Sequence, residues 1–320
     1  MRWRKNGLIF NATGQHEWMS HHASMPTADR IDAETLRIYF GPRTSKGKTV
    51  TTFLDVSAND PTKVLYVHDR PILESGRLGA FDDSGAMPSM VVDHGGLKYL
   101  YYIGWNEGVT VPYRNSIGLA ISRDGGVTFE RAFEGPVVDR TRLEPFFCAT
   151  PFVMVDNGVW KMWYASSTGY LPVDGRIEPV YQVKYAESAD GIEWKRNNTI
   201  CLDYKFAGEA NARPTVVKEG DLFRMWYCAR GSVNYRSDKQ QSYRIGYAES
   251  TNGVDWTRMD DLVGIDRSET GWDSLMMAYP FVYEHGGQKH MLYCGDGFGE
   301  TGFGVATLVE DDRQGPRLKT

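Results

Sequence analysis

Acidic residues recur shortly before a proline that repeats along this chain. The successive spacings are 62, 63, 63 and 66 residues, for Pro26, Pro88, Pro151, Pro214 and Pro280. The carboxylates before the last four prolines are Asp82, Asp83, Glu144, Glu209 and Asp273. Two carboxylates held at a fixed separation can act as the general acid and the base or nucleophile of glycoside hydrolysis. We therefore take these residues as candidate catalytic groups.

A second set of candidates follows an aromatic phrase that repeats after each proline. Equivalent positions behind this phrase hold Arg43, Trp105, Ser167, Arg230 and Asp296. These residues differ between repeats although the phrase is kept, which indicates individual roles; the alternative is that they are merely solvated loop residues. Aromatic faces stack on sugar rings, and guanidinium groups bind carboxylates or phosphates. The predicted substrate-binding residues are His21, His22, Arg43, Trp105, Asn106, Arg213, Arg230 and Asp296.

Three arginines in this set favour an anionic ligand, such as a uronic or nonulosonic sugar or a sugar phosphate.

The segment before the first proline carries His16, Glu17, His21 and His22. Imidazole and carboxylate groups can bind a divalent metal, but the spacing matches no standard zinc motif. Histidines that hydrogen-bond in a pocket, or a general base at His21 or His22, are the alternatives. We expect neither a metal nor another cofactor in the site.

Each repeat is expected to contain short strands that position these residues. The proline opens an apolar run, and the aromatic phrase, Met-Trp-Tyr at 162–164 and 225–227, suits a half-buried strand. A third run ends at a hairpin signal, Asp-Gly or Asn-Gly, which needs positive φ. These dipeptides are at 124–125, 190–191 and 252–253. Four-stranded units repeated radially are propeller blades, so the sequence predicts an all-β, five-bladed β-propeller with four antiparallel strands per blade.

The two ends of the chain predict how the ring closes. The last repeat lacks a fourth strand, whereas residues 3–10 read like residues 194–201, with Trp and Ile six residues apart in both. We expect residues 2–10 to complete the last blade and to cover sheet edges. The chain is then one domain, 1–320, with blades near 11–78, 79–140, 141–205, 206–268 and 269–310 plus 2–10.

Composition excludes several classes of protein. The formal net charge is −5 in 320 residues, which argues against a nucleic-acid binder. No signal peptide or membrane span is expected, so we predict a cytoplasmic protein without a membrane partner. The four cysteines form no C-x-x-C pair, and neither a phosphate-binding loop nor a G-x-S-x-G elbow occurs. We expect a monomer or simple dimer that binds a small molecule or an oligosaccharide.

The proline-led run, the Met-Trp-Tyr strand and the Tyr-Ala-Glu-Ser hairpins at 185–188 and 247–250 resemble the five-bladed propellers of glycoside hydrolase families 43, 32 and 130. The phrases at 79–85, 100–106 and 243–249 are also similar to a bacterial branch associated with surface-polysaccharide or other sugar biosynthesis. The resemblance implies a catalytic Asp beside the first inner proline, where this chain has Ser24-Met25-Pro26. It implies that Glu209 is the general acid, with Asp82 or Asp83 as the second carboxylate.

Three functions therefore remain open. The first is a carbohydrate-active enzyme, glycosidase-like, that works by hydrolysis or phosphorolysis on a sugar or an anionic sugar derivative in an axial funnel. The second is a carbohydrate-binding propeller without catalysis, favoured by the missing first Asp. The third is a non-hydrolytic biosynthetic enzyme with His21 or His22 as its base.

Overall fold

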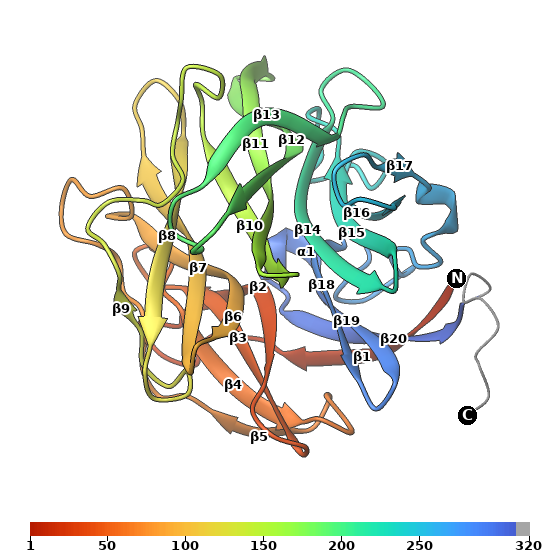
Figure 1. Ribbon diagram of the computed structural model, residues 1–320. Coiled ribbons are helices and arrows are strands. Elements are labelled where there is room, and N and C mark those ends of the chain that lie inside the picture. Colours follow the sequence, from red (N-terminus) through yellow and green to blue (C-terminus); the bar gives the residue numbers. More distant parts are fainter. Residues whose placement is uncertain (312–320) are drawn as a thin grey trace.

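The computed structural model describes residues 1–311, which form five four-stranded antiparallel sheets around one axis (Figure 1). The first two sheets contain β2 (His21–Arg30), β3 (Thr35–Arg43), β4 (Thr52–Ser57) and β5 (Val64–Val67), then β6 (Gly85–His94), β7 (Leu97–Glu107), β8 (Tyr113–Ser122) and β9 (Glu130–Arg131). The next two contain β10 (Cys148–Asp156), β11 (Val159–Val173), β12 (Arg176–Ser188) and β13 (Lys195–Leu202), then β14 (Ala210–Glu219), β15 (Leu222–Arg230), β16 (Arg244–Ser250) and β17 (Thr257–Arg258). The prediction of a five-bladed β-propeller is confirmed.

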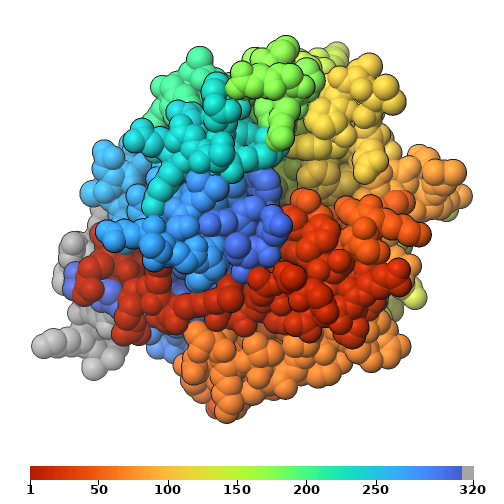
Figure 2. Space-filling view, turned by 180° about the vertical axis from the view of Figure 1, so that it is seen from behind, coloured from red at the N-terminus to blue at the C-terminus, as the bar shows by residue number. Residues whose placement is uncertain are grey.

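The last sheet joins the two ends of the chain. It contains β18 (Ala278–His285), β19 (Gln288–Cys294), β20 (Phe303–Glu310) and, as its outer strand, β1 (Arg2–Phe10). β1 pairs antiparallel with β20, and the two views show the N-terminal segment beside the C-terminal blade (Figures 1 and 2). The predicted closure of the ring by the N-terminal strand is therefore confirmed. The short helices are η1 (Asp260–Leu262) and α1 (Asp296–Gly299), and neither is long enough to cross a membrane.

Neighbouring blades are joined by an aromatic residue at one repeat position in the second strand. Tyr39 and Tyr101 donate hydroxyl hydrogen bonds of 2.9 and 2.7 Å to the carbonyls of Gly126 and Gly191 in the turn of the next blade. Trp163 Nε1 donates in the same way to Gly253 at 2.7 Å. These glycines have positive φ, which the hairpin turns require. The Asp-Gly and Asn-Gly turns are thus parts of the framework.

Each inner strand bulges at the repeated proline. The register of the inner strand against its neighbour shifts there in all five sheets. In four sheets the residue before the proline has positive φ, between 47° and 58°, for Met25, Thr150, Arg213 and Tyr279. This conformation is costly for residues other than glycine, so the surrounding sheet must impose it. The bulge lies on the wall of the axial space described below.

Ring closure depends on Trp3 of β1. Its indole is 6% exposed and packs edge-on against Trp226 of the neighbouring blade, with 5.9 Å between ring centroids. Trp3→Ala should lower the free energy of unfolding in urea by about 3–5 kcal/mol, because the change leaves a cavity at the closure. Leu8→Ala in the same strand is the control, since Leu8 is 40% exposed. Equal losses in the two variants would contradict this role of β1.

Candidate functional site

A cavity of about 360 Å³ lies around the axis, where the loops before the inner strands and after the second strands meet. Its wall is aromatic and cationic. The aromatic side chains are Trp105, Tyr113, Tyr181, Tyr235, Tyr243, Tyr279 and Phe298. The charged side chains are Arg43, Arg230, Arg236 and Glu107. Within residues 1–311, Glu107 is the one acidic residue that lines this axial cavity.

Two of the three arginines have no ion-pair partner within residues 1–311. Arg230 is 2% exposed, donates to the carbonyls of Gly231 and Pro179 at 2.8 and 2.9 Å, and lies over Tyr235, 3.9 Å from the ring centroid. Burial lowers the pKa of the Arg43 guanidinium. A buried positive charge is costly unless an anion or several hydrogen bonds compensate for it. The axial cavity therefore favours an anionic occupant.

The third arginine of the wall is already neutralised. Arg236 forms an ion pair with Glu178 of β12, which also accepts a 3.0 Å hydrogen bond from the Tyr235 hydroxyl. The guanidinium of Arg236 covers the Tyr235 ring, 4.3 Å from its centroid. This contact holds Tyr235 beside Arg230. Arg236 therefore positions an aromatic ring of the wall, whereas Arg43 and Arg230 are the positive charges of the wall that have no ion pair within residues 1–311.

Three predicted catalytic carboxylates are held in ion pairs away from the axial cavity. Asp82 accepts hydrogen bonds from Tyr102 at 3.0 Å and from Arg131 at 2.8 Å. The same arrangement joins Glu144 to Tyr164 and Arg196 at 2.8 and 3.0 Å, and Asp273 to Tyr293 and Lys5 at 3.1 and 2.6 Å. In each blade the cation comes from the outer strand. We call this set of contacts the blade clamp.

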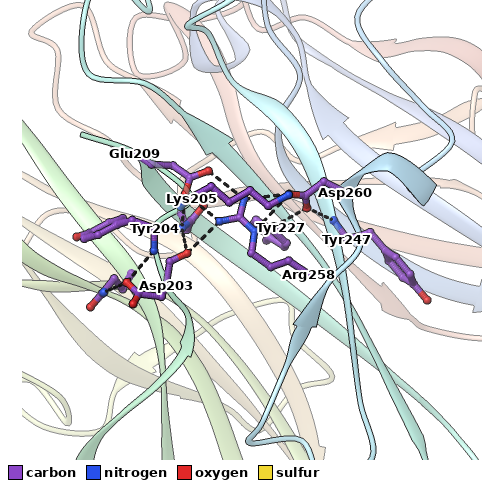
Figure 3. A network of polar contacts seen from close by, with 10 residues as sticks. Asp203, Tyr204, Lys205, Glu209, Tyr227, Tyr247, Arg258 and Asp260 are labelled. Carbon is purple, nitrogen blue, oxygen red and sulfur yellow. Dashed lines mark hydrogen bonds and ion pairs between the residues drawn. The ribbon is translucent and has the colours of Figure 1, made fainter. Parts of the chain in front are cut away.

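Glu209, the predicted general acid, is part of the blade clamp of the fourth blade (Figure 3). It is 1% exposed and receives two hydrogen bonds from Arg258, at 2.8 and 2.9 Å. Arg258 also bonds to Asp260, which accepts the Tyr227 hydroxyl at 2.6 Å. Burial opposes ionisation of Asp260, but hydrogen bonds from Lys205 and Tyr227 and the charge of Arg258 lower its pKa.

The four clamp carboxylates are not brought together. None of them lines the axial cavity, and all are 1–2% exposed, for Asp82, Glu144, Glu209 and Asp273. The first blade replaces the clamp with apolar residues: Met19 and Phe40 are both fully buried in the main hydrophobic cluster. The four carboxylates therefore recur at one repeat position because each makes a structural contact there. The geometry does not support a catalytic role for these four residues.

Asp83 lies closer to the axial cavity. Its carboxylate accepts hydrogen bonds from Ser84 and Asn106 at 2.9 and 3.0 Å, and Ser84 lines the axial cavity. Burial opposes ionisation of Asp83, but hydrogen bonds from the Gly79 N–H, Ser84 and Asn106 lower its pKa. The backbone N–H of Glu107 donates to Ser84 Oγ at 3.2 Å. Asp83 and Glu107 are therefore joined through one serine at the wall of the axial cavity.

The predicted substrate-binding residues separate into two groups. Arg43, Trp105 and Arg230 line the axial cavity, and Asn106 supports Asp83 beside it. His21, His22, Arg213 and Asp296 do not line it. Asp296 instead accepts the backbone N–H groups of Leu275 and Met276 at 2.9 and 2.8 Å, which fixes a loop.

His21 and His22 are neighbours at the start of β2, where His21 is paired with Arg43 of β3. Their Nδ1 atoms are 2.6 Å apart, and His22 is 7% exposed. Burial lowers the pKa of His22 to about 3, and the charge of Arg43 and the proximity of His21 add to this effect. His22 is therefore neutral at physiological pH. Within the described residues no group of three metal-ligating side chains gathers, so the metal alternative at His16, Glu17, His21 and His22 has no geometric support.

Arg213 is fully buried at the axis and is not free to hold a substrate. Its guanidinium donates to the carbonyl of Ser89, to the hydroxyls of Ser89 and Thr27 at 2.8 and 2.9 Å, and to the carbonyl of Pro26 at 3.2 Å. Burial lowers its pKa to about 9. The predicted role in substrate binding is thus replaced in the structure by contacts that link β14 to β2 and β6.

Most of the aromatic wall was not predicted from the sequence. Tyr181 and Tyr243 of this wall stand two residues before the start of the third run of a repeat, at Val183 and Ile245. Asn115 holds the same position before Ile117 but does not line the axial cavity. The wall also contains Tyr113, Tyr235, Tyr279, Arg236, Glu107 and Phe298. A comparison of this third repeat position, which changes between blades, would have found Tyr181 and Tyr243. Tyr235 and Arg236 lie in the loop after β15 and Phe298 lies in α1, and neither segment carries a repeat signal.

No protein-family model matches this sequence. Two proteins of Mycobacterium tuberculosis, the uncharacterized proteins Rv1502 and MT1551, are each 39% identical to it over 309 residues, which are 96% of this chain and 99% of theirs. Among solved structures, a glycoside hydrolase has a TM-score of 0.71 at 18% identity, covering 99% of this chain and 95% of its own. A thermostable family-43 glycoside hydrolase scores 0.64 at 16% identity over 89% and 88% of the two chains. A putative glycosidase from Bacteroides thetaiotaomicron scores 0.70 at 14% identity over 95% and 96%.

The blade clamp predicts that Glu209 acts on stability. Glu209→Gln should lower the free energy of unfolding by roughly 3 kcal/mol, because it leaves the partly buried Arg258 with a weaker partner. Chemical denaturation measures this loss, and Glu193→Gln, at an exposed position, is the control. Unchanged stability combined with lost turnover would instead identify Glu209 as the general acid.

The buried His22 predicts an acid-sensitive fold. The unfolded chain takes up a proton near pH 6.5 and the folded chain near pH 3, so stability falls as the pH decreases through this window. Between pH 6.5 and pH 5, the free energy of unfolding should fall by about 1–2 kcal/mol more in the native chain than in His22→Asn. The reason is that one proton taken up on unfolding changes this free energy by about 1.4 kcal/mol per pH unit. Urea unfolding at both pH values tests this, with exposed His94→Asn as the control. Parallel losses in all three proteins would show that His22 is not buried in its neutral form.

Proposed function

Because this chain belongs to the family of the mycobacterial proteins Rv1502 and MT1551, whose function is not described, and has the fold of five-bladed glycoside hydrolases, we propose that it is a carbohydrate-active, glycosidase-like enzyme. Its substrate is an anionic sugar or sugar derivative that binds in the axial cavity. The predicted role in polysaccharide or sugar biosynthesis and the cytoplasmic location remain predictions, as does the monomeric or dimeric state.

One observation carries the proposal: Arg43 and Arg230 line an aromatic cavity without an ion-pair partner among the described residues. Rings such as Trp105 and Tyr113, whose centroids are 4.7 Å apart, offer faces for a sugar ring. Guanidinium groups hold carboxylates and phosphates through paired, charge-assisted hydrogen bonds. A neutral sugar would leave both positive charges unneutralised.

The proton-transfer groups that best fit this cavity are Asp83 and Glu107. Asp83 has a lowered pKa, which suits a base or nucleophile that must be ionised. Glu107 lines the axial cavity and is the carboxyl group available for the acid role. The clamp carboxylates are each committed to a cation, so they are poor candidates for either role.

The second candidate function is sugar binding without catalysis. It is favoured by the commitment of Asp82, Glu144, Glu209 and Asp273 to ion pairs away from the axial cavity. The third alternative, with a histidine base, has no comparable support, because His21 and His22 do not line this cavity.

Binding measurements test the proposed ligand class. Arg43→Gln and Arg230→Gln should each weaken binding of glucuronate or glucose 6-phosphate by about 10- to 100-fold, since a hydrogen bond to a charged group contributes about 1.5–3 kcal/mol. Isothermal titration against glucose and the exposed variant Arg123→Gln provide the controls. If glucose binds as tightly as the two acids, or if both arginine variants bind like the native chain, the proposal fails.

Turnover separates the enzyme from the binding protein. Asp83→Asn and Glu107→Gln should still bind uronate-containing oligosaccharides but should no longer cleave them. Proton NMR measures this cleavage by the reducing ends that are released. Binding without any cleavage by the native chain would favour the second candidate function.

A further inference from the structure

A smaller pocket lies beneath the axial cavity. It shares Trp105, Tyr113, Tyr181, Tyr243 and Tyr279 with that cavity. Along β7, Glu107 lines only the axial cavity, Trp105 lines both spaces and Ile103 lines only the smaller one. The smaller space is therefore deeper, and we call it the inner pocket. Its volume is about 50 Å³.

The size of the inner pocket limits what can enter it. A water-sized group needs roughly 10–15 Å³ of such space. The inner pocket therefore accepts about three or four non-hydrogen atoms, which is a substituent of a sugar and not its ring.

Most of the inner pocket is apolar. Its apolar lining, apart from the shared aromatic residues, is Met25, Met87, Ile103, Phe147, Ala149, Ala165 and Ala212. The floor at Met25 and Tyr279 is shaped by the strained residues of the inner-strand bulges. A methyl group gains free energy by leaving water for such a surface, whereas a hydroxyl group does not. The lining thus favours a substituent that ends in a methyl group.

Two buried polar atoms beside this space have no hydrogen-bond partner within residues 1–311. They are Asn115 Oδ1, in a residue that is 4% exposed, and Trp105 Nε1. Trp105 and Asn115 are opposite each other in the β7–β8 ladder, so their side chains lie on one face of the sheet. Buried polar groups are nearly always paired, which makes these two exceptions informative. One is an acceptor and the other is a donor.

We propose that the inner pocket receives the acetamido substituent of an N-acetylated anionic sugar. The amide N–H donates to Asn115 Oδ1, the amide oxygen accepts from Trp105 Nε1, and the methyl group packs against Met25 and Met87. The four non-hydrogen atoms of an acetamido group match the available space. This inference rests on the proposed function, because it places the sugar ring in the axial cavity with its acidic group toward Arg43 and Arg230.

Matched pairs of sugars test the inference on the native chain. The probes are N-acetylglucosamine 6-phosphate against glucose 6-phosphate, and the corresponding pair of 1-phosphates, so that the position of the phosphate does not decide the result. In at least one pair the acetylated sugar should bind at least tenfold more tightly. Titration with neutral N-acetylglucosamine measures the contribution of the acid.

Two variants locate the preference. Ala165→Val adds two methyl groups to the wall of the inner pocket, and Asn115→Leu removes the acceptor at similar volume. Each should reduce the acetyl preference to less than about twofold while binding of the glucose phosphates stays the same. If one variant does not fold, the other carries the test.

The outcomes are distinguishable. Equal binding within both pairs overturns the acetamido inference and leaves the proposed function intact. An acetyl preference that survives in the folded variants also overturns it. If neutral N-acetylglucosamine binds as tightly as its phosphates, the proposed function fails. If none of the five sugars binds, both fail.

Discussion

The arrangement of this propeller depends on a guanidinium group buried at its axis. Arg213 projects from the bulge of β14 and donates hydrogen bonds to residues of β2 and β6, so one side chain joins three of the five inner strands. Its two terminal nitrogens donate to carbonyl and hydroxyl groups and not to a carboxylate. Removing such a group from water is costly, and the compensation comes from several hydrogen bonds made at once. The inner strands are thereby held at fixed positions around the space where a ligand would bind.

Charge is distributed differently in the blade clamps and in the axial cavity. In the blade clamp, a carboxylate, a tyrosine and a cation satisfy one another and connect the entry of the inner strand to the outer strand. In the axial cavity, Arg43 and Arg230 remain without an ion pair among the described residues, and Glu178 neutralises Arg236. Most of the acidic groups near the repeated proline are therefore held in ion pairs of the blade clamps. The axial cavity has positive charge surrounded by aromatic rings. This combination suits an anion whose ring stacks on these aromatic rings.

Repetition explains both the success and the failure of prediction from the sequence. The strands, the Asp-Gly turns and the closing role of Trp3 could be predicted because they recur at a constant spacing. The same recurrence makes Asp82, Glu144, Glu209 and Asp273 look like a converging site, although it reflects an ion pair repeated in four of the five blades. Sequence position alone does not tell which side of a bulge a residue faces, so Arg213 was placed on the substrate. Arg43, Trp105 and Arg230, which vary within a constant frame, do line the axial cavity, and their role in substrate binding stays a prediction. Tyr235, Arg236 and Phe298 lie in segments outside the repeat.

We propose that Arg43 and Arg230, the arginines of the axial cavity without an ion pair among the described residues, bind the acidic group of a sugar. The decisive experiment is a crystal structure of the native chain with a bound uronic acid or sugar phosphate. We expect the acidic group to lie within hydrogen-bonding distance of the Arg43 and Arg230 guanidinium groups, with the ring against the aromatic wall. A sugar bound instead at Glu209 and Arg258, or bound in the axial cavity with its acidic group directed away from both arginines, would rule out this role of the two arginines.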